Sequence, residues 1–137
     1  MQQHADIFNS TFKYAKKTAK RYYFKQWAQV NSRCPAFEGE IVNIGREGWE
    51  HTVKIVRRTK MDVLGRLFCL EYARSILDTA TSFQEYTRNK KAGVEFWVFT
   101  SIVGATKVSV VVRSVNNGRK HFYSVIRKGS IEADLEQ

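Results

Sequence analysis

The sequence predicts an α+β fold in which N-terminal helices pack on one face of a roughly four-stranded antiparallel β-sheet. Two observations support this class. Helical periodicity dominates the first half of the chain, whereas the last third contains strand-like runs, two of them joined by an Asn-Gly pair at 117–118. With 137 residues, 43% hydrophobic and 13% aromatic, the chain has the length and composition of one domain with a substantial core.

The first expected element is an amphipathic helix over residues 5–30. Its apolar positions recur at three- and four-residue steps: Phe8, Phe12, Ala15, Ala19, Tyr22 and Val30. Basic residues fill most of the remaining positions, so that residues 1–33 hold seven Lys or Arg side chains and one acidic side chain. This basic face is either an ordinary solvated helix surface or a wall beside an RNA groove.

A loop is expected at 31–35, because Pro35 disfavours helical geometry at the preceding residue. A short strand follows within 37–44, and then a helix that starts near Trp49. The apolar stripe of that helix is expected to be Trp49, Val53 and Val56.

The next helix is expected to begin at a capping box formed by Thr59 and Asp62 and to run to about Thr81. Its later half would bury Cys69, Ala73, Ile76, Leu77 and Ala80. Residues 82–93 are polar and basic and are expected to form a connector. The α+β core of the domain is expected to span residues 38–128.

Three strands are expected at 94–103, 106–115 and 119–128. If Asn117 and Gly118 are the central turn residues, one side of the last hairpin pairs Val110 with Val125, Val112 with Tyr123, and Ser114 with His121. The other side pairs Ser109 with Ile126, Val111 with Ser124, and Arg113 with Phe122. The first side is mostly apolar and should face the helices, which leaves the second side as a half-open binding surface. The acidic tail at 130–137 is expected to be frayed.

The formal net charge of +10 indicates a polyanionic partner, with nucleic acid first and an anionic membrane surface second. The longest apolar run, 94–104, is too short and too polar for a membrane span, and the N-terminus has no signal-peptide pattern. Cys34 and Cys69 lack metal-ligand spacing and suggest free thiols in a reducing cytoplasm.

His51 is the first candidate for chemistry, because histidine is the side chain best suited to proton transfer near neutral pH. On its helix it shares a side with Lys54 and Arg58, and both of these can bind phosphate. The alternative is that His51 is simply a surface residue.

Arg66 lies among apolar positions of its helix, so its guanidinium needs a partner. Asp62, one turn earlier, would be a structural partner. The functional alternative is that Asp62 holds Arg66 in place to bind a phosphate.

The last hairpin is the third candidate. Arg113 offers a two-pronged phosphate contact, Phe122 opposite it would stack on a base, and Ser124 would contact a phosphate oxygen. His121 near the turn would protonate a leaving oxygen, although strand alternation places it on the other face from Phe122. The alternative is an ordinary hairpin with one buried and one exposed face.

Other chemistries fit poorly. The chain has no glycine-rich phosphate loop, no GxSxG and no HExxH motif, and no acidic cluster typical of two-metal nucleases. Cleavage of RNA would therefore need no metal or other cofactor. A base would remove the 2′-hydroxyl proton, and arginines would offset the charge that develops on the phosphate.

The order of these parts resembles the ribonuclease superfamily that includes barnase, EndoU, colicin D and the RelE toxins. Its phage- and mobile-element-encoded members are the most similar. The resemblance covers about residues 38–128 and lies in three motifs: Gly48-Trp49-Glu50-His51 followed by Arg57-Arg58, then Arg66-Leu67, then Lys120-His121-Phe122-Tyr123-Ser124-Val125.

This resemblance implies metal-independent endoribonuclease activity, held in check by an antitoxin or immunity protein. Members of the superfamily use a His, an Arg or Lys, and a Ser or Thr on the last strand. In this sequence the His corresponds to His51, the basic residue to Arg57 or Arg58, and the hydroxyl residue to Ser124. The basic helix at 5–30 lies outside the pattern. It would be a tether, an RNA-gripping extension, or the remnant of a larger polypeptide.

Two other functions remain open on the sequence alone. A non-catalytic nucleic-acid-binding module would use the same surface without turnover and would bind with a strong salt dependence. A protein-interaction domain would dock its basic helix on an acidic partner.

Overall fold

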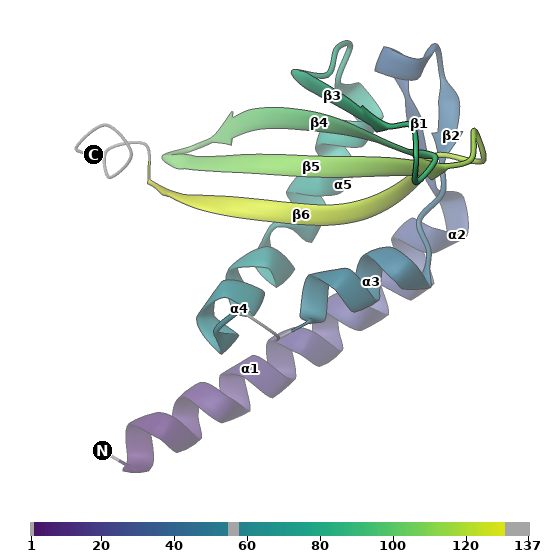
Figure 1. Cartoon of the computed structure of the whole chain (residues 1–137). Coiled ribbons are helices and arrows are strands. Elements are labelled where there is room, and N and C mark those ends of the chain that lie inside the picture. The colour runs from purple at the N-terminus through teal and green to yellow at the C-terminus, as the bar shows by residue number, and fades with distance from the viewer. Residues whose placement is uncertain (1, 55–57, 131–137) are drawn as a thin grey trace.

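The computed structural model describes residues 2–54 and 58–130 and confirms the α+β class. Helices pack on one face of a four-stranded antiparallel sheet with strand order β3-β4-β5-β6 (Figure 1). A second antiparallel sheet joins β1 to β2. The expectation of a frayed tail and the assignments of Val56 and Arg57 fall on residues outside the described part of the chain.

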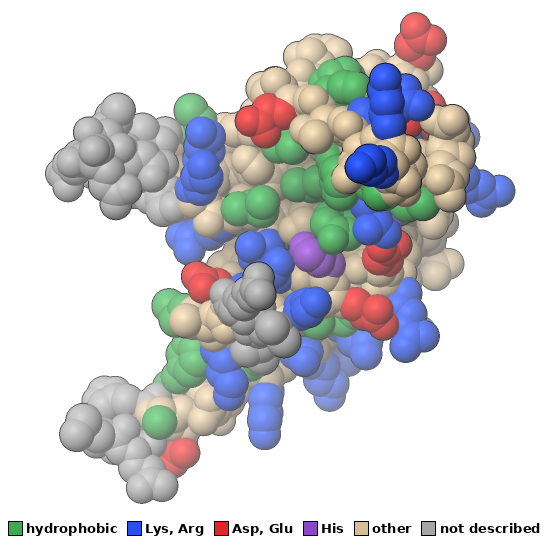
Figure 2. Space-filling model, viewed as in Figure 1, with side chains coloured by type: hydrophobic (Ala, Val, Ile, Leu, Met, Phe, Trp, Pro, Cys, Tyr) green, Lys and Arg blue, Asp and Glu red, His purple; other side chains and the backbone are tan. Residues whose placement is uncertain are grey.

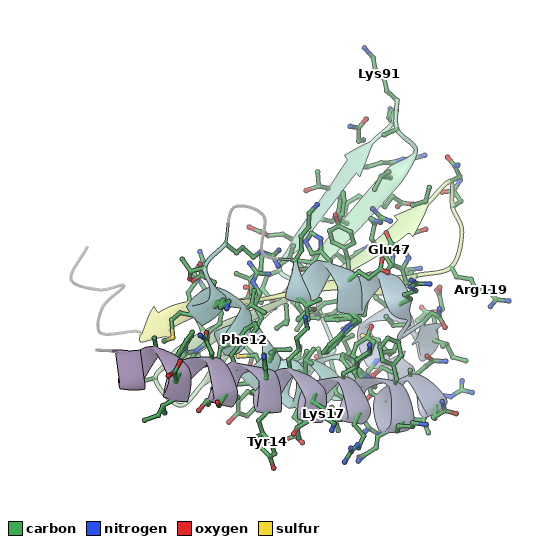
Figure 3. All side chains as sticks on the ribbon, turned by 90° about the horizontal axis from the view of Figure 1, so that it is seen from below. Phe12, Tyr14, Lys17, Glu47, Lys91 and Arg119 are labelled. Atoms are coloured by element: carbon green, nitrogen blue, oxygen red, sulfur yellow. The ribbon has the colours of Figure 1, made fainter. Side chains whose placement is uncertain are left out.

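The N-terminal helix forms as expected. α1 (Gln2–Tyr22) continues into a π-helical turn, η1 (Tyr23–Trp27), and then into α2 (Ala28–Val30). Phe12, Tyr23 and Trp27 are buried. Tyr14 and Lys17 instead point away from the body of the protein (Figure 3). The helix is therefore amphipathic, as its sequence pattern predicts.

Residues 32–42 contain short elements. β1 (Ser32–Cys34) pairs with β2 (Glu40–Val42), and a 3-10 turn, η2 (Pro35–Phe37), connects them. The expected loop at 31–35 thus contains a strand, because Pro35 ends the helix geometry without preventing extended pairing before it. The strand expected within 37–44 is shorter than predicted.

α3 (Arg46–Val53) brings the backbone of Gly48 directly against β6. A Cβ atom at Gly48 would lie 2.5 Å from Cδ2 of Phe122, 2.6 Å from its carbonyl oxygen and 2.7 Å from the Tyr23 hydroxyl. Only glycine permits this approach. It lets Trp49 pack into the core while the N-terminal turn of α3 lies beside the start of β6.

The helix expected from Thr59 to about Thr81 is divided into α4 (Lys60–Phe68) and α5 (Leu70–Thr79). The capping box of Thr59 and Asp62 is confirmed, with the two reciprocal hydrogen bonds at 3.2 and 3.1 Å. The division falls at Cys69, whose N–H donates to the Arg66 carbonyl over 3.0 Å in a tight 3-10-type turn. Most of the predicted buried residues are buried, and Ala80 is half-buried.

The large sheet consists of β3 (Glu85–Asn89), β4 (Val94–Val103), β5 (Thr106–Val115) and β6 (His121–Ser130). β3 lies in the expected connector and was not predicted. Its five residues are all exposed, so they lack the alternation that marks a half-buried strand. A short polar strand suits a sheet edge, which is the position that β3 takes.

One face of the sheet supplies the core. Its buried side chains include Trp97, Phe99, Val110, Val112, Phe122 and Val125. At the β6 end, the Phe122 ring packs 5.0 Å from the Trp27 ring and 6.1 Å from the Tyr23 ring, measured between centroids. The helical layer and the strand are thus joined through aromatic contacts.

The last hairpin departs from the expected register in two ways. Asn116 and Asn117, not Asn117 and Gly118, have positive φ angles of 52° and 58°, and the Gly118 N–H donates to the Val115 carbonyl. A β-bulge then leaves Tyr123 unpaired between its neighbours. Register beyond the bulge is as expected, with Val110 opposite Val125, Val111 opposite Ser124, and Ser109 opposite Ile126.

Before the bulge the expected pairs are wrong. Val112 faces Phe122, and Arg113 faces His121. Because side chains alternate along a strand, this shift by one residue moves Phe122 to the core face and His121 to the open face.

Lys and Arg side chains gather along α1 and around a histidine on the side of the molecule seen in Figure 2. In the described part of the chain, no helix has the length and apolar content needed to span a bilayer.

Candidate functional site

The candidate site lies on the open face of the sheet, where α3 adjoins β6. Phe96, Arg113 and His121 are Cα partners across β4, β5 and β6, so they share this face. The ring of Tyr123, at the bulge, lies 5.6 Å from the Phe96 ring, and the Arg113 guanidinium carbon lies 4.5 Å from the Tyr123 ring centroid.

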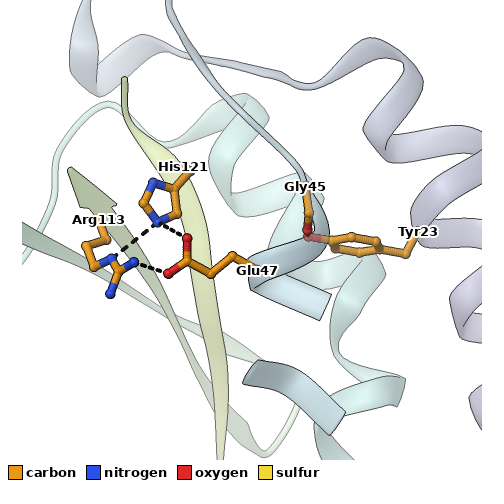
Figure 4. Close-up of polar contacts among 5 residues, drawn as sticks. All are labelled: Tyr23, Gly45, Glu47, Arg113 and His121. Carbon is orange, nitrogen blue, oxygen red and sulfur yellow. Dashed lines mark hydrogen bonds and ion pairs between the residues drawn. The ribbon is translucent and has the colours of Figure 1, made fainter. Parts of the chain in front are cut away.

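Glu47, in the first turn of α3, links that helix to the open face (Figure 4). Its carboxylate forms an ion pair with the Arg113 guanidinium and lies 3.2 Å from Nε2 of His121. Arg113 also donates its Nε–H to His121 Nε2 over 3.3 Å. The two strand residues are therefore positioned by one another and by a carboxylate from the helix.

Burial and the nearby Arg113 charge lower the pKa of His121, whereas a hydrogen bond that the ring donates to the Arg119 backbone opposes the shift. The neutral ring accepts the Arg113 hydrogen bond at Nε2. Protonation converts that nitrogen into a donor, and Glu47 Oε2 is then its nearest acceptor. His121 thus has a defined partner in each protonation state.

His51 stacks on Tyr123, with ring centroids 4.3 Å apart and an interplanar angle of 28°. Arg58, which follows α3 in the chain, contacts both the imidazole and the carbonyls at the C-terminal end of that helix. Its Nη2 lies 3.3 Å from His51 Nε2, and its Nη1 donates to the His51 carbonyl over 2.6 Å. The same Nη1 reaches the carbonyl of Lys54 at 3.4 Å, so Arg58 caps the helix end.

Burial lowers the pKa of His51, and the charges of Arg58, Arg66 and Lys54 lower it further. A cationic surrounding disfavours the imidazolium, so the ring is neutral at neutral pH and able to accept a proton.

Arg66 projects from α4 to β6. Its Nη1 donates to the Ser124 hydroxyl over 3.1 Å and to the Val125 carbonyl over 2.8 Å. The structural partner considered for it, Asp62, instead serves the capping box. Burial and the nearby Arg58 charge lower the pKa of Arg66, although a guanidinium remains charged at neutral pH.

A polar pocket of about 370 Å³ opens beside these residues. It is lined by Arg58, Met61, Asp62, Gly65, Arg66 and Arg127. Arg127 lies across the helix backbone at Gly65, where an added Cβ would meet its Cδ and Nη1 at 3.3 Å. Three guanidinium groups and one carboxylate around an open hollow favour an anion such as a phosphate group.

The structure thus brings together most of the residues that the sequence singled out. His51, Arg58, Arg113 and His121 lie in one chain of contacts that passes through Tyr123, and Arg66 contacts Ser124, the next residue of β6. Lys54 follows α3 at the edge of this group and is exposed. Arg57 lies outside the described residues.

The assignment of Phe122 as a base-stacking surface is wrong. Its ring is 0% exposed and packs against Trp27 and Tyr23. The bulge gives the open-face position to Tyr123. The expectation that His121 and Tyr123 lie on the core face of the sheet is wrong for the same reason.

Sequence reasoning missed Tyr123, Glu47 and Arg127. A bulge leaves no reliable sequence signal, so Tyr123 was assigned to the covered face. Glu47 carried a weak signal, because an acidic residue in the first turn of a helix is also explained by the helix dipole alone. Arg127 lies two residues after the motif of residues 120–125 on which the prediction for β6 was based.

Among the described residues, no group of three or more His, Cys, Asp and Glu side chains is placed to hold a metal ion. No family model, curated protein or solved structure matches this chain.

Proposed function

We propose that this protein is a metal-independent endoribonuclease that cleaves RNA by attack of a 2′-hydroxyl on the adjacent phosphate. The observation that carries the proposal is the position of Tyr123, whose ring contacts the His51 imidazole and the Arg113 guanidinium. A proton acceptor and a phosphate-binding cation are thus held by contacts with the same half-buried aromatic ring, as metal-free attack of a 2′-hydroxyl on phosphorus requires.

In the proposed reaction His51 is the general base. Its neutral ring takes the proton of the 2′-hydroxyl, and the 2′-oxygen forms a bond to phosphorus as the bond from phosphorus to the 5′-oxygen breaks. Arg58 Nη2 lies 3.3 Å from His51 Nε2, and we expect the guanidinium to turn to the phosphate when the 2′-hydroxyl approaches that nitrogen. Products are a 2′,3′-cyclic phosphate and a 5′-hydroxyl.

Arg113 and Arg58 would offset the negative charge that develops on the phosphate oxygens, as preorganised cations do in phosphoryl transfer. Ser124 is buried and accepts a hydrogen bond from Arg66, so it would position that guanidinium instead of contacting the substrate directly. His121 would give a proton to the departing 5′-oxygen, with Glu47 supporting its charged form. Arg127 and Arg66 extend the phosphate-binding surface into the neighbouring pocket.

The decisive test is incubation of a single-stranded RNA with wild type and with His51→Ala, each in excess EDTA. Wild type should yield fragments with 2′,3′-cyclic phosphate ends, and the variant should be at least about a hundredfold slower, the usual contribution of general acid–base catalysis. The variant, purified in parallel, also controls for contaminating nucleases. Equal cleavage by both proteins, or intact RNA with both, would refute the assignment.

The same experiment separates the two other functions. A non-catalytic nucleic-acid-binding module would bind this RNA with steep salt dependence but leave it intact. A protein-interaction domain would show little affinity for RNA at physiological salt.

We also propose an inhibitory protein as a partner, as the resemblance to toxin-like ribonucleases implies, and the cytoplasm as the compartment. An acidic inhibitor would find the guanidinium groups of Arg58, Arg66 and Arg127 around one hollow. Cys34 and Cys69 are free and buried, which fits a reducing compartment. Host growth during expression without an inhibitor tests this proposal. Wild type should be toxic if it acts on cytoplasmic RNA and needs an inhibitor, whereas His51→Ala should be tolerated.

A further inference from the structure

The basic side chains of α1 are not accounted for by the site described above. They fall into two groups on the helix surface. Lys16 and Lys20 lie in one row at four-residue spacing, and Lys13, Lys17 and Arg21 lie in the next row at the same spacing. The two rows face different surroundings, which allows their roles to be separated.

The row of Lys16 and Lys20 continues to Phe24, the next position at four-residue spacing. The Phe24 ring packs on Trp49 of α3, with centroids 6.0 Å apart. Since residues in one row lie above one another on the same side of a helix, the two lysines extend along α1 from the contact with α3.

The other end of this side of α1 is fixed by Lys60, the first residue of α4. Its Nζ donates to the Asn9 side-chain oxygen over 3.3 Å and lies 5.7 Å from the Phe12 ring centroid. Lys16 and Lys20 are therefore located between the α3 contact and the α4 contact. Lys54 directly follows α3, and Arg58, which contacts His51, lies two residues before α4.

The remaining surfaces of α1 differ. Lys17 points away from the protein body, as does Tyr14 (Figure 3). The flank near α4 and α5 forms a largely apolar groove of about 300 Å³, lined in part by Tyr14, Tyr22 and Phe68. Lys16 and Lys20 thus lie on the side of α1 between its contacts with α3 and α4.

We propose that Lys16 and Lys20, the lysine flank, bind the sugar–phosphate backbone of an RNA strand that continues out of the candidate site. Lysine is a point-charge phosphate binder that needs no fixed geometry. A protein partner would require an aromatic or apolar anchor at the centre of its footprint, and the two flank residues offer only ammonium groups. This inference rests on the proposed function, because the candidate site is where the RNA strand is taken to start.

The lysine flank implies a substrate class. An RNA that reaches from the site to α1 must extend several nucleotides beyond the cleaved bond, so the enzyme should prefer long single strands to dinucleotides. This preference arises from backbone contacts, so it should be independent of base sequence.

The first measurement is binding of a single-stranded RNA in a His51→Ala background, which prevents cleavage. The flank double variant Lys16→Gln/Lys20→Gln is compared with the control double variant Lys17→Gln/Arg21→Gln, which removes the same charge from the same helix. The slope of log K against log salt should fall in magnitude by about 1.4 in the flank variant, roughly 0.7 for each lost phosphate contact. The control slope should change by less than half as much.

The second measurement is the ratio of kcat/KM for a long RNA to that for a dinucleotide, with His51 intact. The ratio should fall in the flank variant and stay near the wild-type value in the control. Equal losses in both variants would indicate a diffuse field and overturn the inference, as would no loss in either. If wild type cleaves no RNA, the proposed function fails, and the binding slopes still decide the role of the lysine flank.

Discussion

The imidazole of His51 stacks on the phenol ring of Tyr123 with 4.3 Å between ring centroids. This contact joins α3 to the bulge of β6 and places a titratable ring on the open face of the sheet. The same phenol ring lies beneath the Arg113 guanidinium. One aromatic side chain therefore sets the distance between the proposed base and a proposed phosphate-binding group.

Tyr123→Ala should lower kcat/KM by about ten- to a hundredfold, because the ring positions both His51 and Arg113 and misplacement of catalytic groups costs up to about 10²-fold. Tyr123→Phe should stay close to wild type, since it retains the ring that His51, Arg113 and Phe96 contact. Binding and cleavage assays on both variants check this. A Phe variant as impaired as the Ala variant would assign the role to the hydroxyl.

Phe122, the neighbouring residue, should behave in the opposite way. Phe122→Ala removes a fully buried ring from its contacts with Trp27 and Tyr23 and should cost about 3–5 kcal/mol of unfolding free energy. Tyr123→Ala should cost much less, because its ring is only half-buried. Urea denaturation of the two variants makes the comparison. Similar losses would mean that the bulge does not separate the two faces as described.

The contrast between these neighbours shows where sequence reasoning succeeds and where it ends. Alternation and turn chemistry located β4 and β5 at their observed bounds. The capping box located the start of α4, because it depends only on local hydrogen bonds. Such local signals are enough for the fold class and for most of the elements.

The orientation of β6 depended on a non-local choice. Asn116-Asn117 competes with Asn117-Gly118 as the turn pair, and a single unpaired residue reverses the faces of the side chains before it. The sequence therefore predicted His51, Arg66 and Ser124 as site residues, but it assigned the aromatic ring of the open face to Phe122 instead of Tyr123. The carboxylate of Glu47 reaches the site only through tertiary packing of α3 on β6.

Gly48 makes that packing possible. Gly48→Ala would place a Cβ within 2.5–2.7 Å of Phe122 and of the Tyr23 hydroxyl, so α3 must move away from β6. We expect a loss of stability of at least about 1–3 kcal/mol, the usual cost of overpacking a core. Thermal denaturation measures it, with Gly104→Ala as a contrasting surface variant whose Cβ meets no atom within 4 Å but whose φ of +61° adds backbone strain. A Gly48 variant as stable as wild type would contradict the close approach of helix and strand.

The pH dependence of cleavage should reflect the environment of His51. Burial and neighbouring cations lower its pKa below the ordinary histidine value of about 6.5, so the neutral base persists into mildly acidic solution. kcat/KM should rise with pH through a midpoint below 6.5 as His51 loses its proton, and fall again as His121, the proposed acid, loses its own. Arg58→Gln removes the neighbouring charge that lowers the pKa of His51 most, so this pKa rises and the midpoint should move to higher pH.

Lys54→Gln is the matched control for this shift, because Lys54 contributes less to lowering the pKa of His51 than Arg58 does. The pH midpoint of kcat/KM should move less in Lys54→Gln than in Arg58→Gln, even if the two variants differ in maximal rate. A midpoint that stays fixed in Arg58→Gln would mean that the acid limb reports a group other than His51.

Glu47 distinguishes the proposed assignment from one in which a carboxylate is the base. In our assignment Glu47 restrains Arg113 and supports protonated His121, so Glu47→Gln should reduce kcat by no more than about tenfold and should strengthen RNA binding by freeing the Arg113 guanidinium. If Glu47 were the general base, kcat would fall by about a hundredfold or more. Single-turnover cleavage together with equilibrium binding separates these outcomes. Glu50→Gln is the control, because Glu50 lies on the same helix and pairs with Arg46 in solvent.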